Sequence, residues 1–334
     1  MSPPSRPRRS GEARDVLDQL DATEARGGDG ILTLPGSDRL TVSNLGKIFW
    51  PGTRPLTKGD LFRHYVRVAP FLLPTLADRP LVMKRYPNGV TEKPFYQHRA
   101  SGAMPAGVRV EMVDTGTEQR PHVIGGSLTS LLYTVQLASI SQDPWFSRIG
   151  SEDDIDHVAI DLDPPDDLPF ARVLDVARWV REELDALKAP AFPKTSGSGG
   201  LHVYVPMRPG TSYEAGLLFG QIVATRVAAR HPNAATVERS IKARGRRVYV
   251  DYLQNIKGKT LASAYSARAN LFAGVSAPLT WNEIDDGVKP QDFTMRSFAN
   301  RLADAGDLWA ALRTANGADL RAIVQGGSSF RTRR

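Results

Sequence analysis

The stretch HVAIDLDPP, residues 157–165, predicts a β-strand that carries two carboxylates. Because side chains alternate across a strand, its apolar residues face the core, whereas Asp161 and Asp163 share the opposite face. The two prolines that follow end the strand. Neighbouring carboxylates repel each other unless a cation lies between them, so the pattern predicts a divalent metal site. The alternative is a pair of side chains that caps the next helix.

A second strand, RVYVDYL at residues 247–253, repeats this pattern. Asp251 is a carboxylate in the middle of an otherwise apolar strand, where burial is costly without a metal or a cationic partner. Together with Asp161 and Asp163 it would hold two hard ions, Mg²⁺ or Mn²⁺. Such a pair can activate a 3′-hydroxyl and stabilise a leaving pyrophosphate. The alternative for Asp251 is a buried salt bridge to a nearby arginine.

Between these strands lies KTSGSGGLHVYVP, residues 194–206, with a loop of glycines and serines that runs into a third strand at 201–207. Backbone N–H groups and hydroxyls in such a loop can surround phosphate oxygens. The loop lacks the G-K-[ST] ending of a Walker A motif and precedes a strand, so it is a different kind of phosphate loop. A plain turn is the alternative. The candidate phosphate contacts are Ser196, Gly197, Ser198, His202 and Arg244, which lies seven residues before Asp251.

Other segments predict strands and helices in mixed order. The strands are 31–34, 40–43 and 81–87, and the helices are 58–76 (with Thr57 as N-cap), 127–142, 171–187 and 214–230. This order predicts an α+β (mixed α/β) fold. We expect a flexible basic tail over 1–30 with at most one short helix at 12–25, a catalytic domain over 31–310, and a C-terminal helix and basic tail over 311–334.

The composition narrows the class of protein. The chain has 334 residues, 41% of them hydrophobic and 24% charged, and contains no cysteine, which excludes disulfides and cysteine-zinc sites. Neither a secretory signal nor an apolar run long enough to span a membrane is apparent. The net charge of +7 favours a polyanionic partner such as nucleic acid. We expect a cytoplasmic bacterial monomer that associates with the nucleoid when it acts.

Three motifs, DLDP at 161–164, TSGSGGLH at 195–202 and VDYLQN at 250–255, resemble those of the archaeo-eukaryotic primase superfamily, in the same order. Within it, the chain resembles the polymerase domain of bacterial DNA ligase D and its stand-alone actinobacterial primase-polymerase relatives, from residue 38 to about 300. The resemblance implies a primase-like core of central antiparallel or mixed sheets flanked by helices. It also implies a template-dependent polymerase that adds NTPs or dNTPs.

The resemblance further implies a site for the 5′-phosphate of a downstream DNA strand. An asparagine and two lysines near the N-terminus hold that phosphate in the family, and Asn44, Lys47 and Lys58 stand at the matching positions. Such residues taken singly are also typical of an ordinary protein surface.

Five residues correspond to positions near the incoming nucleotide in the family. They are Lys84, Arg85, Phe95, Tyr96 and Gln254. The two aromatic rings would pack against bases, and a stacked base gains about 1–3 kcal/mol. Packing in the core is the alternative for one of the two rings.

The chain departs from the family pattern at four positions. Asp143 stands where a histidine is common, Ser141 where a glutamate is common, and His98 and Gly199 each replace a frequent lysine. None of them belongs to the predicted metal site. We expect altered nucleotide affinity or substrate preference, with the chemistry retained.

These observations predict a primase-polymerase that fills short gaps bearing a 5′-phosphate during excision repair or end joining, with gapped or primer-template DNA as its partner. The length leaves no room for a ligase motif or a nuclease domain, so we expect a separate DNA ligase and other repair proteins to act with it. The alternative is a non-catalytic module that binds gapped or single-stranded DNA. An aspartyl-phosphate phosphohydrolase is disfavoured by Pro165, two residues after the second aspartate.

Overall fold

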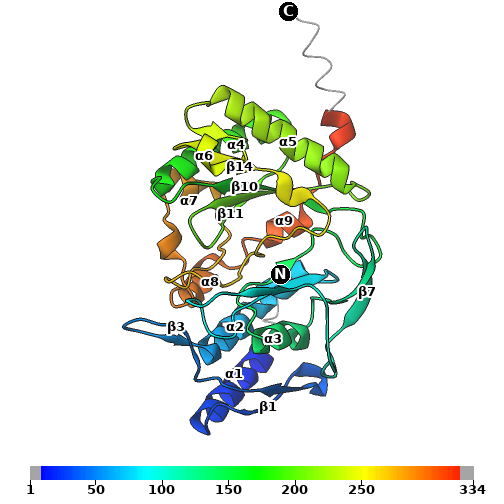
Figure 1. The fold of residues 1–334 in the computed structure, drawn as a ribbon, viewed down its shortest axis with the longest axis vertical. Coiled ribbons are helices and arrows are strands. Elements are labelled where there is room, and N and C mark those ends of the chain that lie inside the picture. Colours follow the sequence, from blue (N-terminus) through cyan, green and yellow to red (C-terminus); the bar gives the residue numbers. More distant parts are fainter. Residues whose placement is uncertain (1–8, 324–334) are drawn as a thin grey trace, which may run out of the picture.

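The computed structural model describes residues 9–323 and shows two halves, one above the other in Figure 1. The lower half contains helices α1 (Arg9–Ala25), α2 (Lys58–Leu76) and α3 (Leu128–Gln136). The upper half contains a five-stranded sheet with α4 (Phe170–Ala186) and α5 (Tyr213–Arg230). This architecture confirms the α+β class.

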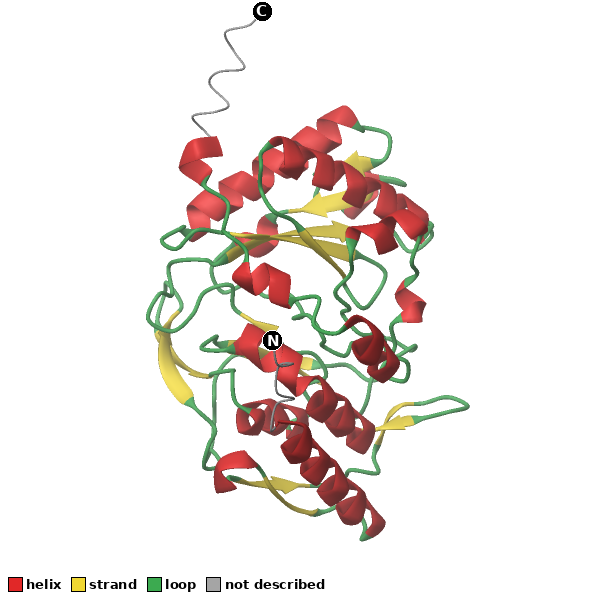
Figure 2. Cartoon of the chain, turned by 180° about the vertical axis from the view of Figure 1, so that it is seen from behind, coloured by secondary structure: helices red, strands yellow, loops and turns green. Residues whose placement is uncertain are grey.

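The five-stranded sheet has the order β11-β12-β10-β14-β13, and all its neighbours are antiparallel except β13 and β14. Its strands are β10 (His157–Asp163), β11 (Phe192–Thr195), β12 (Leu201–Pro206), β13 (Ala235–Thr236) and β14 (Val248–Asp251). Helices α4 and α5 pack against the sheet and cover the face that points away from the lower half (Figure 2). The three strands predicted around the motifs are therefore confirmed, and the opposite face is left for the functional residues.

The predicted helices are confirmed in the main, with one difference. Thr57 is the N-cap of α2 and forms a capping box with Asp60, as its position suggested. The helix predicted over 127–142 ends early, at Gln136. Ala138 takes a left-handed conformation with φ 65°, and the short strand β9 (Asp143–Pro144) follows, which pairs with β5 (Leu81–Arg85). Pairing with β5 thus replaces the last helical turns.

The prediction of a flexible tail through residue 30 is wrong for residues 9–30. Helix α1 includes the segment where a short helix was allowed, but it packs into the core, with Val16 and Leu20 buried. Arg63 of α2 also forms ion pairs with Asp21 and Glu24 of α1. Residues 1–8 and 324–334, which include the rest of the predicted tails, lie outside the described residues.

The remaining elements are short. They are β1 (Gly30–Thr33), β2 (Arg39–Val42), β3 (Ile48–Trp50), β4 (Leu56–Thr57), β5 (Leu81–Arg85), β6 (Phe95–Gln97), β7 (Val110–Asp114), β8 (Gln119–Val123), β9 (Asp143–Pro144), α6 (Ile241–Arg244), α7 (Trp281–Asp286), α8 (Phe298–Ala305) and α9 (Ala310–Thr314). Between residues 9 and 323, none of the helices has the length and apolar character to cross a membrane.

Candidate active site

The register of the large sheet brings three of the predicted residues side by side. Asp161 of β10 lies directly opposite His202 on β12 and directly opposite Asp251 on β14. Residues opposite each other in a sheet point to the same face. The apolar neighbours Ile160 and Leu162 are fully buried, as the alternation required, and Asp163 follows on the same face as Asp161.

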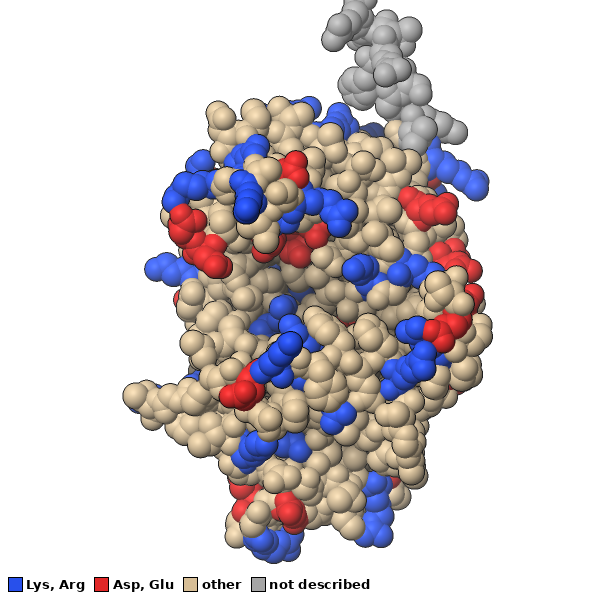
Figure 3. All heavy atoms as spheres, in the orientation of Figure 1, with Lys and Arg blue, Asp and Glu red and all other residues tan. Residues whose placement is uncertain are grey.

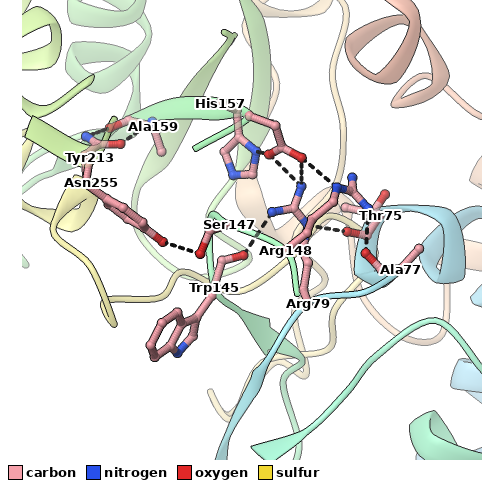
Figure 4. Close-up of polar contacts among 11 residues, drawn as sticks. Thr75, Ala77, Arg79, Trp145, Ser147, Arg148, His157, Ala159, Tyr213 and Asn255 are labelled. Carbon is pink, nitrogen blue, oxygen red and sulfur yellow. Dashed lines mark hydrogen bonds and ion pairs between the residues drawn. The ribbon is translucent and has the colours of Figure 1, made fainter. Parts of the chain in front are cut away.

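The side-chain amide of Asn255 forms hydrogen bonds with the part of β10 that does not pair with β14. Strand β14 pairs only with the end of β10, so Ala159 lacks a strand partner on that side. The buried Asn255 side chain accepts from Ala159 N at 2.8 Å and donates to Ala159 O at 2.8 Å (Figure 4). This contact replaces a missing pair of ladder bonds and fixes the strand just before Asp161.

Each of the three aspartates has a different partner within the protein. Asp163 accepts from Arg244 Nη1 at 3.2 Å, and the Arg244 guanidinium stacks 3.8 Å above the centre of the Tyr249 ring. His202 Nε2 lies 3.3 Å from Asp161 Oδ1. Arg244, which was expected to contact a triphosphate, thus contacts the carboxylate of Asp163 in this structure.

Asp251 makes no ion pair with an arginine in the described part of the chain, so the salt-bridge alternative for it is wrong. Its carboxylate accepts from Leu253 N at 2.8 Å and from Gln254 Nε2 at 2.8 Å. Gln254, expected close to the active site, therefore contacts a predicted metal ligand directly. The helix-capping alternative for Asp161 and Asp163 is also wrong, because α4 begins after Pro169 without a side-chain cap.

The three carboxylates suit a hard divalent cation by their chemistry and charge. Burial first, and then the charges of Asp163 and Asp251, raise the pKa of Asp161 to about 7. A cation bound there would relieve that repulsion. Among residues 9–323, however, no three His, Asp or Glu side chains stand close enough to hold a metal ion as they are. Asp163 and Asp251 would have to turn away from Arg244 and Gln254 to share one.

The glycine-serine loop is held in shape by its own hydroxyl group. Ser196 Oγ accepts from Ser198 N and from Gly200 N, each at 3.1 Å. Gly197 has φ 74°, and a Cβ there would lie 2.7 Å from Ser276 N, so only glycine fits. Gly199, which replaces a common lysine of the family, has open space around its missing Cβ.

Two residues that the sequence did not indicate fasten this loop from outside. Arg268 Nη1 donates to Ser196 O and Asn270 Nδ2 donates to Gly197 O, both at 2.6 Å. They come from a segment without regular hydrophobic periodicity, some 70 residues further along the chain. No signal in the single sequence could have found them.

Lys194 is a third residue that the sequence reading missed, although it directly precedes the loop. Its side chain is fully buried, and Nζ lies 2.9 Å from His202 Nδ1 while it donates to Ala262 O at 2.9 Å and Ser276 Oγ at 2.6 Å. An ammonium group has three hydrogens and no lone pair. A charged Lys194 would therefore leave the proton of His202 on Nε2, facing Asp161.

These groups surround a pocket of about 470 Å³. Figure 3 shows it as the hollow between the two halves, with acidic side chains on its upper wall and basic side chains below. Among the residues that line it are Asp161, Asp163, Ser196, Ser198, Gly199, His202 and Arg268 from the upper half and Lys84, Tyr96, Ser141 and Asp143 from the lower half. The two halves therefore contribute to one site.

Of the residues expected near the nucleotide, neighbours on β5 and β6 point to opposite faces, so not all of them line the pocket. Lys84 lines the pocket, with Nζ 5.5 Å from the centre of the Tyr96 ring. Arg85 points elsewhere, donating to Leu137 O and stacking over Phe95. Phe95 and Tyr96 are 47% and 60% exposed, so the core-packing alternative for one of these rings is wrong. Both remain available to a base.

The departure at Asp143 lies inside the pocket. Ser141 Oγ donates to Asp143 Oδ2 at 2.9 Å, so the two departing residues contact each other. Burial raises the pKa of Asp143, whereas the nearby charges of Arg268 and Lys84 lower it. With Asp161, Asp163 and Asp166, Asp143 makes four carboxylates in the lining of the pocket. His98, the other departure, stacks on Tyr96 with ring centres 6.1 Å apart.

The three residues expected to bind a 5′-phosphate lie together in the lower half. Lys58, at the start of α2, is only 5% exposed and donates to Ser43 O at 3.0 Å, next to Asn44. Burial first, and then the charge of Lys47, lower the pKa of Lys58 to about 8. Neither lysine forms an ion pair with a carboxylate within the described chain. For Lys58 this is not an ordinary surface position.

A comparison with known protein families and structures matches the same region of the chain. Residues 57–309 match the family described as the LigD primase-polymerase domain. A solved structure, the polymerase domain from Mycobacterium tuberculosis ligase D in complex with DNA, superposes with a TM-score of 0.76 at 30% identity, covering 84% of this chain and all of that one.

Curated relatives agree with this match. The bifunctional non-homologous end joining protein LigD of Bacillus subtilis is 30% identical over 273 residues, which are 81% of this chain and 44% of that protein. The multifunctional non-homologous end joining DNA repair protein LigD of M. tuberculosis is 32% identical over 278 residues, 81% and 36% of the two chains. The chain thus spans less than half the length of these relatives.

Proposed function

Since the chain belongs to the LigD primase-polymerase domain family, a family of nucleotidyltransferases, we propose that it extends a primer 3′ end on a DNA template with NTPs or dNTPs. We further propose that it fills short gaps whose downstream strand carries a 5′-phosphate, during the repair of DNA breaks. The names of its relatives, which are end-joining proteins, support that setting.

The placement of Asp161 between His202 and Asp251 is the observation that carries this proposal. Asp161 is largely buried, and its two carboxylate neighbours make it costly to ionise, although the charges of Lys194 and Arg268 partly offset them. A bound cation would neutralise this cluster of carboxylates. Asp161, Asp163 and Asp251 are the residues that would hold Mg²⁺ or Mn²⁺. When bound, two such ions supply activation of the primer 3′-hydroxyl and neutralisation of the leaving pyrophosphate.

The chain's own residues then bind and orient the triphosphate. The N–H groups of Ser196, Ser198 and Gly200 are used within the loop, so the hydroxyls of Ser196 and Ser198, the N–H of Gly199 and the ring of His202 are the groups at the pocket wall that would contact it. Lys84 faces them from the lower half and adds a positive charge. Arg244, which donates to Asp163 here, would be free to contact the nucleotide if Asp163 held a cation. Tyr96, exposed beside Lys84, offers its ring to a base.

The pair Lys47 and Lys58 is proposed to bind the 5′-phosphate of the downstream strand. Two lysines that form no ion pair in the described chain lie together here, one of them buried, and Asp29 only partly offsets their charge. A phosphate dianion would raise the lowered pKa of Lys58 and accept hydrogen bonds from both side chains. The DNA-bound state of the similar M. tuberculosis structure supports DNA as the ligand class.

The test is extension of a labelled primer on a short gapped duplex with a downstream 5′-phosphate, supplied with manganese and either NTPs or dNTPs. Templated extension by the wild type, lost in the double variant Asp161→Ala/Asp163→Ala, is the expected result. The relative rates with the two kinds of nucleotide would give the sugar preference.

A wild type that binds the duplex tightly but adds no nucleotide would contradict the enzyme and leave a DNA-binding module. Retention of activity in the double variant would remove the role of the aspartates. Extension that is equal with a 5′-hydroxyl would contradict the phosphate pocket alone.

A further inference from the structure

A second cavity, larger than the catalytic pocket, lies at the other end of β10. Its volume is about 700 Å³, within the usual range of small-molecule sites. The strand that presents Asp161 to the catalytic pocket begins with His157, which lines this second cavity. The two cavities are separate but share Leu261 as a wall residue.

One side of the second cavity is a continuous series of rings. Phe146 and His157 lie with ring centres 4.6 Å apart, His157 and Tyr204 4.9 Å apart, and Tyr204 and Trp309 5.2 Å apart. All four residues line the cavity and are buried. Such a wall favours a flat, apolar or aromatic group over a flexible polar one.

The other side carries an excess of positive charge. Asp156 accepts hydrogen bonds from both Arg79 and Arg148 and from the ring of His157 (Figure 4). Arg79 is 3% exposed, and its remaining bonds go to the carbonyls of Thr75 and Trp145, so it is fixed in place.

The other two arginines of the lining, Arg208 and Arg313, each pair with one aspartate. Four arginines thus face three carboxylates, counting Asp156, Asp307 and Asp319. Burial first lowers the pKa of His157, which keeps its ring neutral. One positive charge of the cavity therefore remains uncompensated.

Several polar atoms of the lining have no partner between residues 9 and 323. Arg148 uses Nε and Nη1 on Asp156 and Ala77 O, which leaves Nη2 free at a residue about one-third exposed. The Nε2 of His157 and the hydroxyl of Tyr204 make no hydrogen bond to the described protein. Two donors and one acceptor thus remain beside the rings, a set that can orient a polar ligand.

The wall opposite these groups is rigid. Ala318 N donates to Pro206 O at 2.8 Å, and a Cβ on Gly317 would lie 2.2 Å from the Met207 carbonyl carbon. The segment that closes the cavity is thus pinned to β12. A ligand would enter a largely preformed space.

We propose that this cavity binds a planar aromatic anion of the nucleoside monophosphate class, with the base against the ring wall and the phosphate toward Arg148. The site is separate from the one proposed for the incoming triphosphate, and its test does not depend on polymerase activity. The shared residue Leu261 and the neighbouring Ala262, whose carbonyl accepts a hydrogen bond from Lys194, separate the ligand from Lys194 and His202 of the other pocket.

The test is photo-cross-linking of the full chain with 8-azidoadenosine 5′-monophosphate in the presence of a metal chelator, followed by peptide mapping. Saturable labelling within residues 144–148, 204–209 or 309–317 is expected. AMP should displace the probe, whereas inorganic phosphate or adenosine at the same concentration should not, because each offers only half of the recognised chemistry.

A matched pair of variants localises the binding. Leu312→Trp adds an indole to a buried residue of the cavity lining and should lower labelling by at least about tenfold through loss of space. Leu218→Trp makes the same change at a 57% exposed position of α5 outside the lining and should leave labelling unchanged. Circular dichroism checks that both variants fold.

Arg148→Gln serves if Leu312→Trp does not fold, because Asp156 keeps Arg79 and His157 as partners. It should weaken AMP displacement by about tenfold, as expected for one charge-assisted hydrogen bond. Absence of saturable labelling, labelling confined to the catalytic loop at 196–200, or equal labelling of the two tryptophan variants would overturn the proposal.

Discussion

The aspartates of the upper half and the lysines of the lower half are opposite versions of one arrangement. Near Asp161, burial and two neighbouring carboxylates raise the pKa of an acid to about 7. Near Lys58, burial and a neighbouring lysine lower the pKa of a base to about 8. In both places like charges lie together and are only partly compensated, by Lys194 and Arg268 near Asp161 and by Asp29 near Lys58. The difference is the sign, which would favour a metal cation at one site and a phosphate anion at the other.

The two sites also differ in how they are built. Asp161 and Asp251 are fixed by strand register within a sheet. Lys58 is fixed by a helix start, and Lys47 lies in a turn, where its Nζ donates to Asn88 Oδ1 at 3.3 Å. The first site is thus positioned within a five-stranded sheet and the second beside the two-stranded pair β3 and β4, where Lys58 N donates to Lys47 O at 2.9 Å. We expect the acidic site to tolerate less change than the basic one.

The largest effect is expected from Asp161→Asn. It should lower kcat for nucleotide addition by about a thousandfold, because a ligand shared by the proposed ions is lost. In the absence of divalent ions the same change should raise the free energy of unfolding by about 1–2 kcal/mol, since it removes one of three crowded carboxylates. Primer extension and chemical denaturation in a chelator measure the two effects. A variant that is less stable than the wild type but equally active would contradict the description of Asp161 as one of three crowded metal ligands.

Lys58→Met should affect DNA binding and not the rate of nucleotide addition. Binding of a gapped duplex with a 5′-phosphate should weaken by roughly 10- to 100-fold, while binding of the 5′-hydroxyl duplex changes little. Lys289→Met, a change of another lysine outside both sites, is the matched control. Fluorescence anisotropy with the two duplexes gives the ratio. If both duplexes lose affinity equally, Lys58 provides general charge and not a phosphate pocket.

The pH dependence of the same binding should follow the charge of Lys58. Above pH 8 the free protein loses this proton, so the Kd for the 5′-phosphate duplex should rise by up to about tenfold per pH unit. The Lys58→Arg variant stays charged and should show a flatter profile.

The free energy of unfolding should rise over the pH range in which DNA binding weakens. Between pH 8 and about 10.5 the unfolded chain binds more protons at this lysine than the folded chain, so Lys58 adds stability as the pH rises. Wild-type binding that is unchanged from pH 7 to pH 9 would contradict an anion held by Lys58.

The smallest effect is expected from Asp143→Asn. A neutral amide in place of this fourth carboxylate leaves Lys84 and Arg268 with less competition for the triphosphate. The KM for nucleotides should fall about threefold with kcat nearly unchanged, because the change affects binding and not the reacting atoms. Steady-state kinetics separates the two constants. A lower kcat would mean that Asp143 belongs to the catalytic group of residues.

Strand alternation was enough to predict the acidic site, because Asp161 and Asp163 interrupt a strand whose other residues are apolar. The resemblance to a family supplied the lysines, which no periodicity marks. Contacts between distant segments could not be predicted: Arg268 reaches the loop across 72 residues of sequence, and Arg244 pairs with Asp163 across 81. Helix α1 resembles a tail in sequence because it has few bulky apolar residues. Its docking combines the buried Val16 and Leu20 with ion pairs to Arg63.

The side chain of Asn255 has a consequence for solubility. The first half of β10 has β12 on one side and no strand on the other, so its open edge could pair with a strand of another molecule. Because Asn255 occupies both the N–H and the carbonyl of Ala159, that edge cannot accept a foreign strand in register. The Asn255 amide, which fixes the strand before Asp161, thus also prevents edge-to-edge pairing of this strand with another molecule.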